Sequence, residues 1–246
     1  MTVSQRIKQR AGEIGFSAVG IVPADRLERE AQRLENWLRA GMHGEMAYME
    51  RNFELRIDPE KLLPGTKTVI SVIANYFPDS GQKESAVPDH GKISIYAQGQ
   101  DYHAVLKQKL YELFEYVIEQ VGAVNGRAFV DSAPMLDKAW AERAGIGWIG
   151  KHTNLINRRI GSYFFIGNLL LDCTLNYDTP AITNYCGTCT ACIDHCPTEA
   201  IVAPYQVDAR KCISYLNIEL KRDLTADEQA MLGAWLFGCD ICQQVC

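Results

Sequence analysis

Apolar residues recur with a helical period in three segments of the first two thirds of the chain. In residues 102–121 they form one wide stripe, which predicts a helix that ends near Gly122. Weaker helical periods cover residues 5–14 and 26–38, and the second segment is polar enough to lie on the surface of a sheet. These segments alternate with strand-like runs, so the pattern predicts a mixed α/β region.

Strands are predicted where apolar and β-branched residues follow one another without a helical period. Such runs cover residues 17–24, 67–77 and 162–175, and the run 67–77 is typical of a central strand. Another strand, which starts at Gly126, is expected to end at Asp131. These runs and the helices predict an α+β fold built on a sheet.

The segment after Asp131 predicts a further helix and then a glycine-rich loop. Ser132 is an expected N-cap, and Pro134 would lie in the first turn of the helix. The loop that follows contains Gly145, Gly147 and Gly150, which indicate that the backbone approaches another segment closely. Their spacing matches neither the dinucleotide fingerprint nor the phosphate-loop motif, so no nucleotide site is predicted here.

Cysteine usage divides the chain into two parts. The sequence has nine cysteines, and the first of them is Cys173. Because the composition changes abruptly near Leu171, we predict one domain over residues 1–172 and a second over residues 173–246. In a reducing compartment, thiols in such number are expected to be metal ligands or redox groups rather than disulfides.

The spacing of the thiols is that of a bacterial ferredoxin with two [4Fe-4S] clusters. Cys186, Cys189, Cys192 and Cys196 follow the x2, x2, x3 rhythm and precede a proline, and a second run, Cys212, Cys239, Cys242 and Cys246, keeps the x2 and x3 gaps. With the ligand exchange of such ferredoxins, the first cluster would be held by Cys186, Cys189, Cys192 and Cys246, and the second by Cys196, Cys212, Cys239 and Cys242. A zinc site or unrelated core cysteines are the alternatives. Cys173 is left over, and we predict that it is a small buried hydrophobic residue.

Charge and hydropathy limit where the protein can be located and which partners it can bind. The formal net charge is -5, so the composition shows no basic footprint for nucleic acid. No apolar run approaches the roughly 18 residues of a membrane span, and the N-terminus lacks the apolar region of a secretory signal. We therefore predict a cytoplasmic protein that makes no membrane contact. The sequence stops at a predicted ligand, Cys246, and we expect that it is a truncated form of a longer chain.

Taken with the thiol spacing, several stretches of the first domain resemble the epoxyqueuosine reductases. They are Asp101-Tyr-His103, Asp131-Ser-Ala-Pro134, the run from Ala141 to His152, and the run from Phe237 to Cys246. The resemblance covers the whole chain. It implies a nitroreductase-like α/β domain that binds cobalamin, followed by a ferredoxin-like module with two clusters. It also implies the last step of queuosine biosynthesis, reduction of the epoxide of epoxyqueuosine in tRNA. A helical-repeat extension that many members carry after the clusters is absent from this sequence.

The resemblance also implies roles for individual residues. Asp131 matches the catalytic aspartate, which would donate a proton to the departing oxygen and could be kept protonated beside a corrin; capping of the next helix is the alternative. Arg56 would contact amide or phosphate groups of the corrin, unless it is a solvated surface residue. The other candidates for the cobalamin site are Gln98, Tyr102 and His152, with His103 beside them. Lys151 could meet a tRNA phosphate, although a solvated lysine is the simpler interpretation.

This reading implies partners and leaves alternatives. The expected partners are the modified tRNA and an external low-potential electron donor of the flavodoxin or ferredoxin type, and the protein is expected to be a monomer. A cobalamin-dependent reductive dehalogenase would pair the same cofactors, whereas a non-enzymatic iron–sulfur carrier would have no need of a corrin. A nitroreductase-like flavoprotein with added clusters would bind a flavin in its place.

Overall fold

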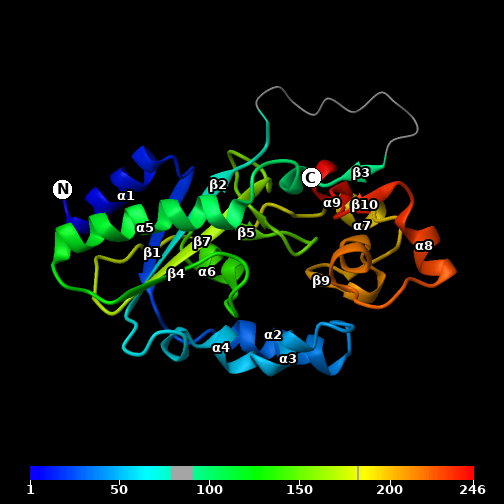
Figure 1. The fold of residues 1–246 in the computed structure, drawn as a ribbon, viewed down its shortest axis with the longest axis horizontal. Helices are drawn as coiled ribbons and strands as arrows, with labels where there is room; N and C mark the ends of the chain where they lie inside the picture. The colour runs from blue at the N-terminus through cyan, green and yellow to red at the C-terminus, as the bar shows by residue number, and fades with distance from the viewer. Residues whose placement is uncertain (79–90, 182) are drawn as a thin grey trace.

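A four-stranded sheet forms the centre of the computed structural model, which describes residues 1–78, 91–181 and 183–246. The strands are β1 (Ala18–Pro23), β2 (Thr68–Asn75), β4 (Gly126–Phe129) and β7 (Phe164–Leu171), in the spatial order β1-β2-β7-β4 (Figure 1). All neighbouring strands are antiparallel, and β2 pairs with β7 along its whole length. The sheet therefore joins segments that lie about a hundred residues apart in the sequence.

Helices cover both faces of this sheet. α1 (Val3–Ile14) and α5 (Tyr102–Val121) pack against each other on one face (Figure 1). The other face is covered by α6 (Asp137–Arg143), together with α2 (Glu28–Arg39) and α4 (Phe53–Ile57). Shorter elements are α3 (Ala47–Arg51), η1 (Pro59–Lys61), η2 (Ile95–Ala97), β5 (Trp148–Ile149) and β6 (Leu155–Ile156).

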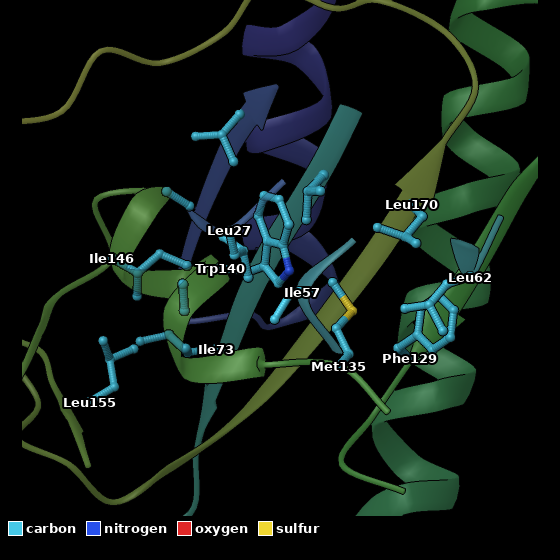
Figure 2. Packing of buried hydrophobic residues seen from close by; sticks show 14 of the residues in the cluster. Leu27, Ile57, Leu62, Ile73, Phe129, Met135, Trp140, Ile146, Leu155 and Leu170 are labelled. Carbon is cyan, nitrogen blue, oxygen red and sulfur yellow. The ribbon is translucent and has the colours of Figure 1, made fainter. Parts of the chain in front are cut away.

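Each face of the sheet has its own hydrophobic core. Beneath α1 and α5, Ile7 and Leu110 are fully buried against side chains of β2 and β7. On the other face, Trp140 of α6 lies among Leu27, Ile57 and Ile73 (Figure 2). Burial of a large apolar side chain contributes roughly 1.5–3 kcal/mol. Since the central strands serve both cores, they read as continuous apolar runs rather than as alternating ones.

Residues 185–246, called here the thiol-rich module, consist of short elements around the cysteines. They are α7 (Ala191–Asp194), β8 (Ile201–Ala203), β9 (Gln206–Val207), η3 (Ala209–Lys211), η4 (Tyr215–Glu219), α8 (Ala226–Leu232), β10 (Trp235–Phe237) and α9 (Ile241–Gln244). The buried hydrophobic cluster of the module comprises Ala209, Tyr215 and Leu216. The apolar core of this module is therefore small in comparison with those of the sheet.

The thiol-rich module is joined to the first part of the chain by backbone and side-chain contacts. β3 (Lys92–Ile93) pairs in parallel with β10, so a segment from the first half of the sequence completes a sheet of the module (Figure 1). The indole nitrogen of Trp37 donates to the Val207 carbonyl oxygen at 2.7 Å. The backbone amide of Glu45 donates to the Tyr215 hydroxyl at 2.8 Å. The predicted division between residues 172 and 173 stays a prediction, and these contacts cross it.

Most predicted elements are present, but the start of the helix after Asp131 was predicted wrongly. The helices predicted at residues 5–14, 26–38 and 102–121 are α1, α2 and α5, and the four predicted strands are β1, β2, β4 and β7. α6 begins only at Asp137 and has no side-chain cap, whereas the Ser132 hydroxyl donates to the Val130 carbonyl oxygen. Asp131 has φ of 49°, and this left-handed residue turns the chain into a loop.

The glycine-rich loop behaves as predicted. A Cβ atom at Gly147 would lie 2.1 Å from the Ile156 carbonyl oxygen, so the close neighbour is a strand of the same protein. Among the described helices, none combines the length and the apolar character needed to cross a bilayer.

Candidate functional site

Asp131 lies in the loop that follows β4, and a tyrosine holds its carboxylate. The Tyr102 hydroxyl donates to Asp131 Oδ2 at 2.5 Å, and His103 Nε2 lies 3.5 Å from the same oxygen. Burial, this hydrogen bond and the charge of Asp131 raise the pKa of Tyr102, so the tyrosine remains a donor. The Asp131 side chain itself is 65% exposed, so protein atoms alone do not desolvate its carboxyl group.

Aromatic stacking fixes the position of Tyr102. Its ring lies parallel to that of Phe165 of β7, with centroids 4.0 Å apart, and the His103 ring stacks on it with centroids 4.0 Å apart. Asp101 caps α5 by accepting the His103 amide and also contacts His103 Nδ1 at 2.9 Å. The start of α5 is thus a rigid platform for the Asp131 loop.

Gln98 is exposed, and its side chain is already engaged. Its amide nitrogen donates to the Ile93 carbonyl oxygen at 2.7 Å, in the short segment between β3 and α5. Gln98 therefore supports the local backbone, and its contact with a cobalamin stays a prediction.

Arg56 is a buried cation with an unsatisfied nitrogen. It is 8% exposed, so the alternative of a solvated surface arginine is wrong. Its Nε has no hydrogen-bond partner in the described part of the chain, and its guanidinium lies 5.6 Å from the centroid of the Tyr48 ring. Burial lowers the pKa of Arg56, while Tyr48 and Asp137 act in the opposite direction. A buried donor without a partner is costly, and a bound ligand would supply the acceptor.

Asp137 and Lys138 of α6, which were not among the predicted site residues, lie near Asp131. Asn168 of β7 donates to Asp137 Oδ1 at 2.6 Å and also contacts the Ser71 hydroxyl. Burial raises the pKa of Asp137 to about 7, with a smaller contribution from Asp131. The only signal in the sequence was their position at the start of an amphipathic helix, just after the Asp131 loop.

Lys138 of α6 lies near both the Asp131 loop and the thiols. Its ammonium donates to Asn154 Oδ1 at 3.4 Å, and its side chain is exposed to solvent. Burial lowers the pKa of Lys138, and the negative groups that act in the opposite direction are Cys242, Asp131, Asp137 and Cys212.

Four of the thiols line one cavity. Its volume is about 250 Å³, and its walls include Cys196, Cys212, Cys239 and Cys242. In the described residues, no three histidine, cysteine or acidic side chains are placed to hold a single metal ion. A multi-atom cluster needs thiols spread around a larger space than a single metal ion does.

His152 lines the same cavity and is buried. Its Nδ1 accepts the Asn154 backbone amide at 3.1 Å, which places the ring proton on Nε2. Nε2 is buried and has no partner among the described residues. Burial lowers the pKa of His152 to about 4, so near pH 7 the ring is neutral and presents an N–H group.

The remaining predicted ligands lie together elsewhere in the thiol-rich module. Burial and the neighbouring thiols of Cys186, Cys192 and Cys189 raise the pKa of Cys246. α7, which contains Cys192, packs against α9, which precedes Cys246. The Trp148 indole nitrogen lies 3.5 Å from Cys186 Sγ. The structure thus brings the thiols together in the two sets predicted by the ferredoxin spacing, and the ligand assignment itself stays a proposal.

Cys173 belongs to neither set. It lies just after β7, is half-buried, and packs against the hydrophobic core beneath α1 and α5. This placement agrees with the prediction of a small hydrophobic residue.

Comparison with known proteins assigns both parts of the chain. The family description "Epoxyqueuosine reductase QueG" matches residues 56–132, and "4Fe-4S double cluster binding domain" matches residues 185–246. The epoxyqueuosine reductase of Leadbetterella byssophila is 54% identical over 243 residues, which cover 99% of this chain and 78% of that protein.

Solved structures agree with this assignment. Epoxyqueuosine reductase from Bacillus subtilis has a TM-score of 0.88 at 30% identity, and the match covers 99% of this chain and 64% of that one. A crystal structure of epoxyqueuosine reductase with an epoxyqueuosine-modified tRNA-Tyr stem loop has a TM-score of 0.87, with the same identity and coverage. The chain thus spans about two thirds of the solved relatives, and it belongs to the epoxyqueuosine reductase family of oxidoreductases.

Proposed function

We propose that the protein reduces the epoxide of epoxyqueuosine in tRNA to queuosine, the last step of queuosine biosynthesis. Membership of the family supports this reaction, as does the solved relative in complex with a modified tRNA stem loop. The same name at 54% identity favours this activity over the reductive dehalogenase and the electron carrier. The protein would then act in the cytoplasm, where tRNA is modified. It would act as a monomer.

The reaction sets the requirements that the site must meet. Removal of the epoxide oxygen consumes electrons and protons and leaves an alkene and water. The departing oxygen needs a proton donor, and the electrons must arrive at a low potential. The protein must therefore place an acid beside the epoxide and hold the redox groups in line with it.

Asp131 is the proposed acid. Its carboxylate is exposed and is held on one side by the Tyr102 hydroxyl. In the Bacillus subtilis relative, a catalytic loop designated by an aspartate is swung out of the active site. Asp131 itself has a left-handed backbone conformation and lies on the loop after β4. This loop would be the corresponding element. A bound substrate and cofactor would cover the carboxylate and supply the desolvation that the protein alone lacks.

The residues near Asp131 and the second thiol set fit a cobalamin. Arg56 Nε and His152 Nε2 have no partner in the described part of the chain, and both are donors suited to amide or phosphate oxygens of such a ligand. Tyr102 presents its stacked ring beside Asp131, and Lys138 supplies a cation near the Asp131 loop. When bound, cobalamin would supply a cobalt centre for the reductive chemistry that single-electron clusters do not perform.

The two thiol sets suit electron transfer from solvent to the proposed cobalamin site. Cys189 and Cys246 of the first set are exposed. The second set lines the cavity that also contains His152 and Tyr96. Electrons from an external donor of the flavodoxin or ferredoxin type would therefore enter at the first thiol set.

The single observation that carries the proposal is the hydrogen bond from the Tyr102 hydroxyl to Asp131, in a region that Lys138 shares with the thiols. The test compares wild type with Asp131→Asn after reconstitution with iron, sulfide and cobalamin, on a tRNA stem loop carrying epoxyqueuosine. We expect kcat to fall by about 10²–10⁴-fold, because loss of a general acid has effects of this size. Iron and cobalt should stay at about eight and one per chain.

Asp25→Asn is the matched control, because Asp25 is exposed and distant from the Asp131 loop in the sequence. It should turn over at the wild-type rate. A wild-type protein that holds both cofactors but converts no epoxyqueuosine would overturn the proposed function. An unchanged rate in Asp131→Asn would overturn the role of Asp131 alone.

A further inference from the structure

Lys151 is buried beside the first thiol set, contrary to the expectation of a solvated or tRNA-binding lysine. It is 9% exposed. Its ammonium donates to the carbonyl oxygens of Gly187 and Cys189, at 2.8 and 2.7 Å. A group so enclosed cannot reach a phosphate of a bound tRNA, so that expectation is wrong. The structure instead uses the side chain inside the thiol-rich module.

No carboxylate neutralises this ammonium in the described part of the chain, where none lies within 4.0 Å of Lys151 Nζ. Its hydrogen-bond partners are neutral carbonyl groups. A buried charge without a counter-ion is unfavourable, because the interior solvates it less well than water does. An anionic group nearby would remove this cost, and a cluster held by four thiolates is such a group.

The two carbonyl oxygens belong to the turn that presents the first thiols. The Cys189 amide donates to the Cys186 carbonyl oxygen at 2.9 Å, so the residues 186–189 form a tight turn. The Trp148 indole nitrogen lies 3.5 Å from Cys186 Sγ. One loop thus directs both an N–H group and a positive charge at the same turn.

The neighbouring residue of this loop serves the other thiol set. His152 lines the cavity with Cys196, Cys212, Cys239 and Cys242, and its Nδ1 accepts the Asn154 amide. The loop is a turn, closed by a hydrogen bond from the Thr153 amide to the Gly150 carbonyl oxygen. The buried lysine therefore lies on the side of the first set. On the side of the second set the nearby cation is Lys138, which is exposed, so solvent screens its charge.

We propose that Lys151 tunes the reduction potential of the cluster held by Cys186, Cys189, Cys192 and Cys246, and raises it above that of the second cluster. A positive charge stabilises the reduced, more negative state of a cluster, and a buried charge is little screened by solvent. The step is the gain of one electron from a low-potential donor, with no bond made or broken. It makes the exposed cluster the point of electron entry. This inference depends on the proposed ligand sets but not on turnover of tRNA.

The test is an anaerobic redox titration of the reconstituted protein, followed by electron paramagnetic resonance. Lys151→Gln keeps a hydrogen-bond donor for the turn but removes the charge, and Lys151→Met removes both. We expect each variant to move one of the two potentials to a more negative value and to leave the other nearly unchanged. Lys151→Arg keeps the charge and should stay near the wild-type value.

Lys211→Gln is the matched control, since Lys211 is an exposed cation next to Cys212 and solvent screens its charge. It should shift either potential less than Lys151→Gln does. Potentials that are unchanged in Lys151→Gln at full iron content would show that the lysine is only a structural clamp. Equal shifts of both potentials would also overturn the proposal.

A second measurement, on a chain that keeps Lys151, applies if Lys151→Gln and Lys151→Met fail to hold iron. Cys242→Ser alters the second cluster and so identifies its signal. The higher of the two potentials should then belong to the first cluster. A lower potential for the first cluster would overturn the proposal, whatever the activity of the protein. Loss of tRNA turnover with these potentials intact would count only against the proposed function.

Discussion

The part of the chain around the four-stranded sheet and the thiol-rich module differ in how much apolar surface they bury. The sheet has a hydrophobic core on each face, with Leu110 and Trp140 almost completely enclosed. In the module, the buried apolar cluster comprises Ala209, Tyr215 and Leu216, and α8 has no buried residue. Hydrophobic burial suffices for the first region. The second must gain stability from its iron–thiolate bonds and from contacts with the first, as small metal-binding domains do.

Removal of iron is expected to have the largest effect, and it should be confined to the thiol-rich module. Binding of a structural metal contributes on the order of 10 kcal/mol in small domains. Hydrogen exchange should therefore show loss of protection across α7 and α9 after chelation, while β2 and β7 stay protected. Cys173→Ser, which changes a cysteine outside both sets, should retain the iron of the wild type. Protection of α7 and α9 that survives chelation would show that the module has an adequate core of its own.

Leu110→Ala should destabilise the sheet region and leave the thiol-rich module intact. Leu110 is fully buried beneath α5, so the substitution leaves a cavity and should lower the free energy of unfolding of the sheet region by about 2–5 kcal/mol. Urea unfolding measures this change, and iron content at zero urea should equal that of wild type. Leu236→Ala is the control, because Leu236 is 66% exposed and its loss should change stability by less than about 0.5 kcal/mol. A loss of iron in Leu110→Ala would mean that the two regions are not stabilised independently.

The smallest effects should come from two capping boxes of the same geometry, one in each region. Thr2 accepts the Gln5 amide at 3.2 Å, and Thr225 accepts the Glu228 amide at 3.2 Å. Loss of such a cap lowers helix stability by about 1 kcal/mol. In Thr2→Ala the global free energy of unfolding should fall by this amount, because α1 packs on the core of the sheet.

Thr225→Ala should leave global unfolding unchanged. α8 buries no residue, so its opening is local, and the loss of the cap should speed hydrogen exchange in α8 by about fivefold. A fall in global stability equal to that of Thr2→Ala would show that α8 unfolds together with the rest of the protein.

The long elements and the redox chemistry were predictable because they depend on local sequence. The apolar stripe from Tyr102 to Val121 coincides with α5, and the apolar runs of β2 and β7 lie in the centre of the sheet. Helical and strand periods depend on one segment at a time, so they can be recognised without knowledge of the fold. The spacing of Cys186, Cys189 and Cys192 is local in the same sense, since one turn and one short helix present all three thiols.

The environment of the polar side chains was decided only by the tertiary structure. The sequence left Arg56 between a corrin contact and a solvated surface position, and it favoured a solvated Lys151, yet the structure buries both of them. Asp137 and Lys138 gave only their position at the start of an amphipathic helix as a signal, because the first cause of their pKa shifts is burial, which depends on the fold. The sequence alone thus determined the elements, the thiol rhythm and the family. Burial of a charge depends on which segments fold around it, so the buried cations at Arg56 and Lys151 followed from the tertiary structure alone.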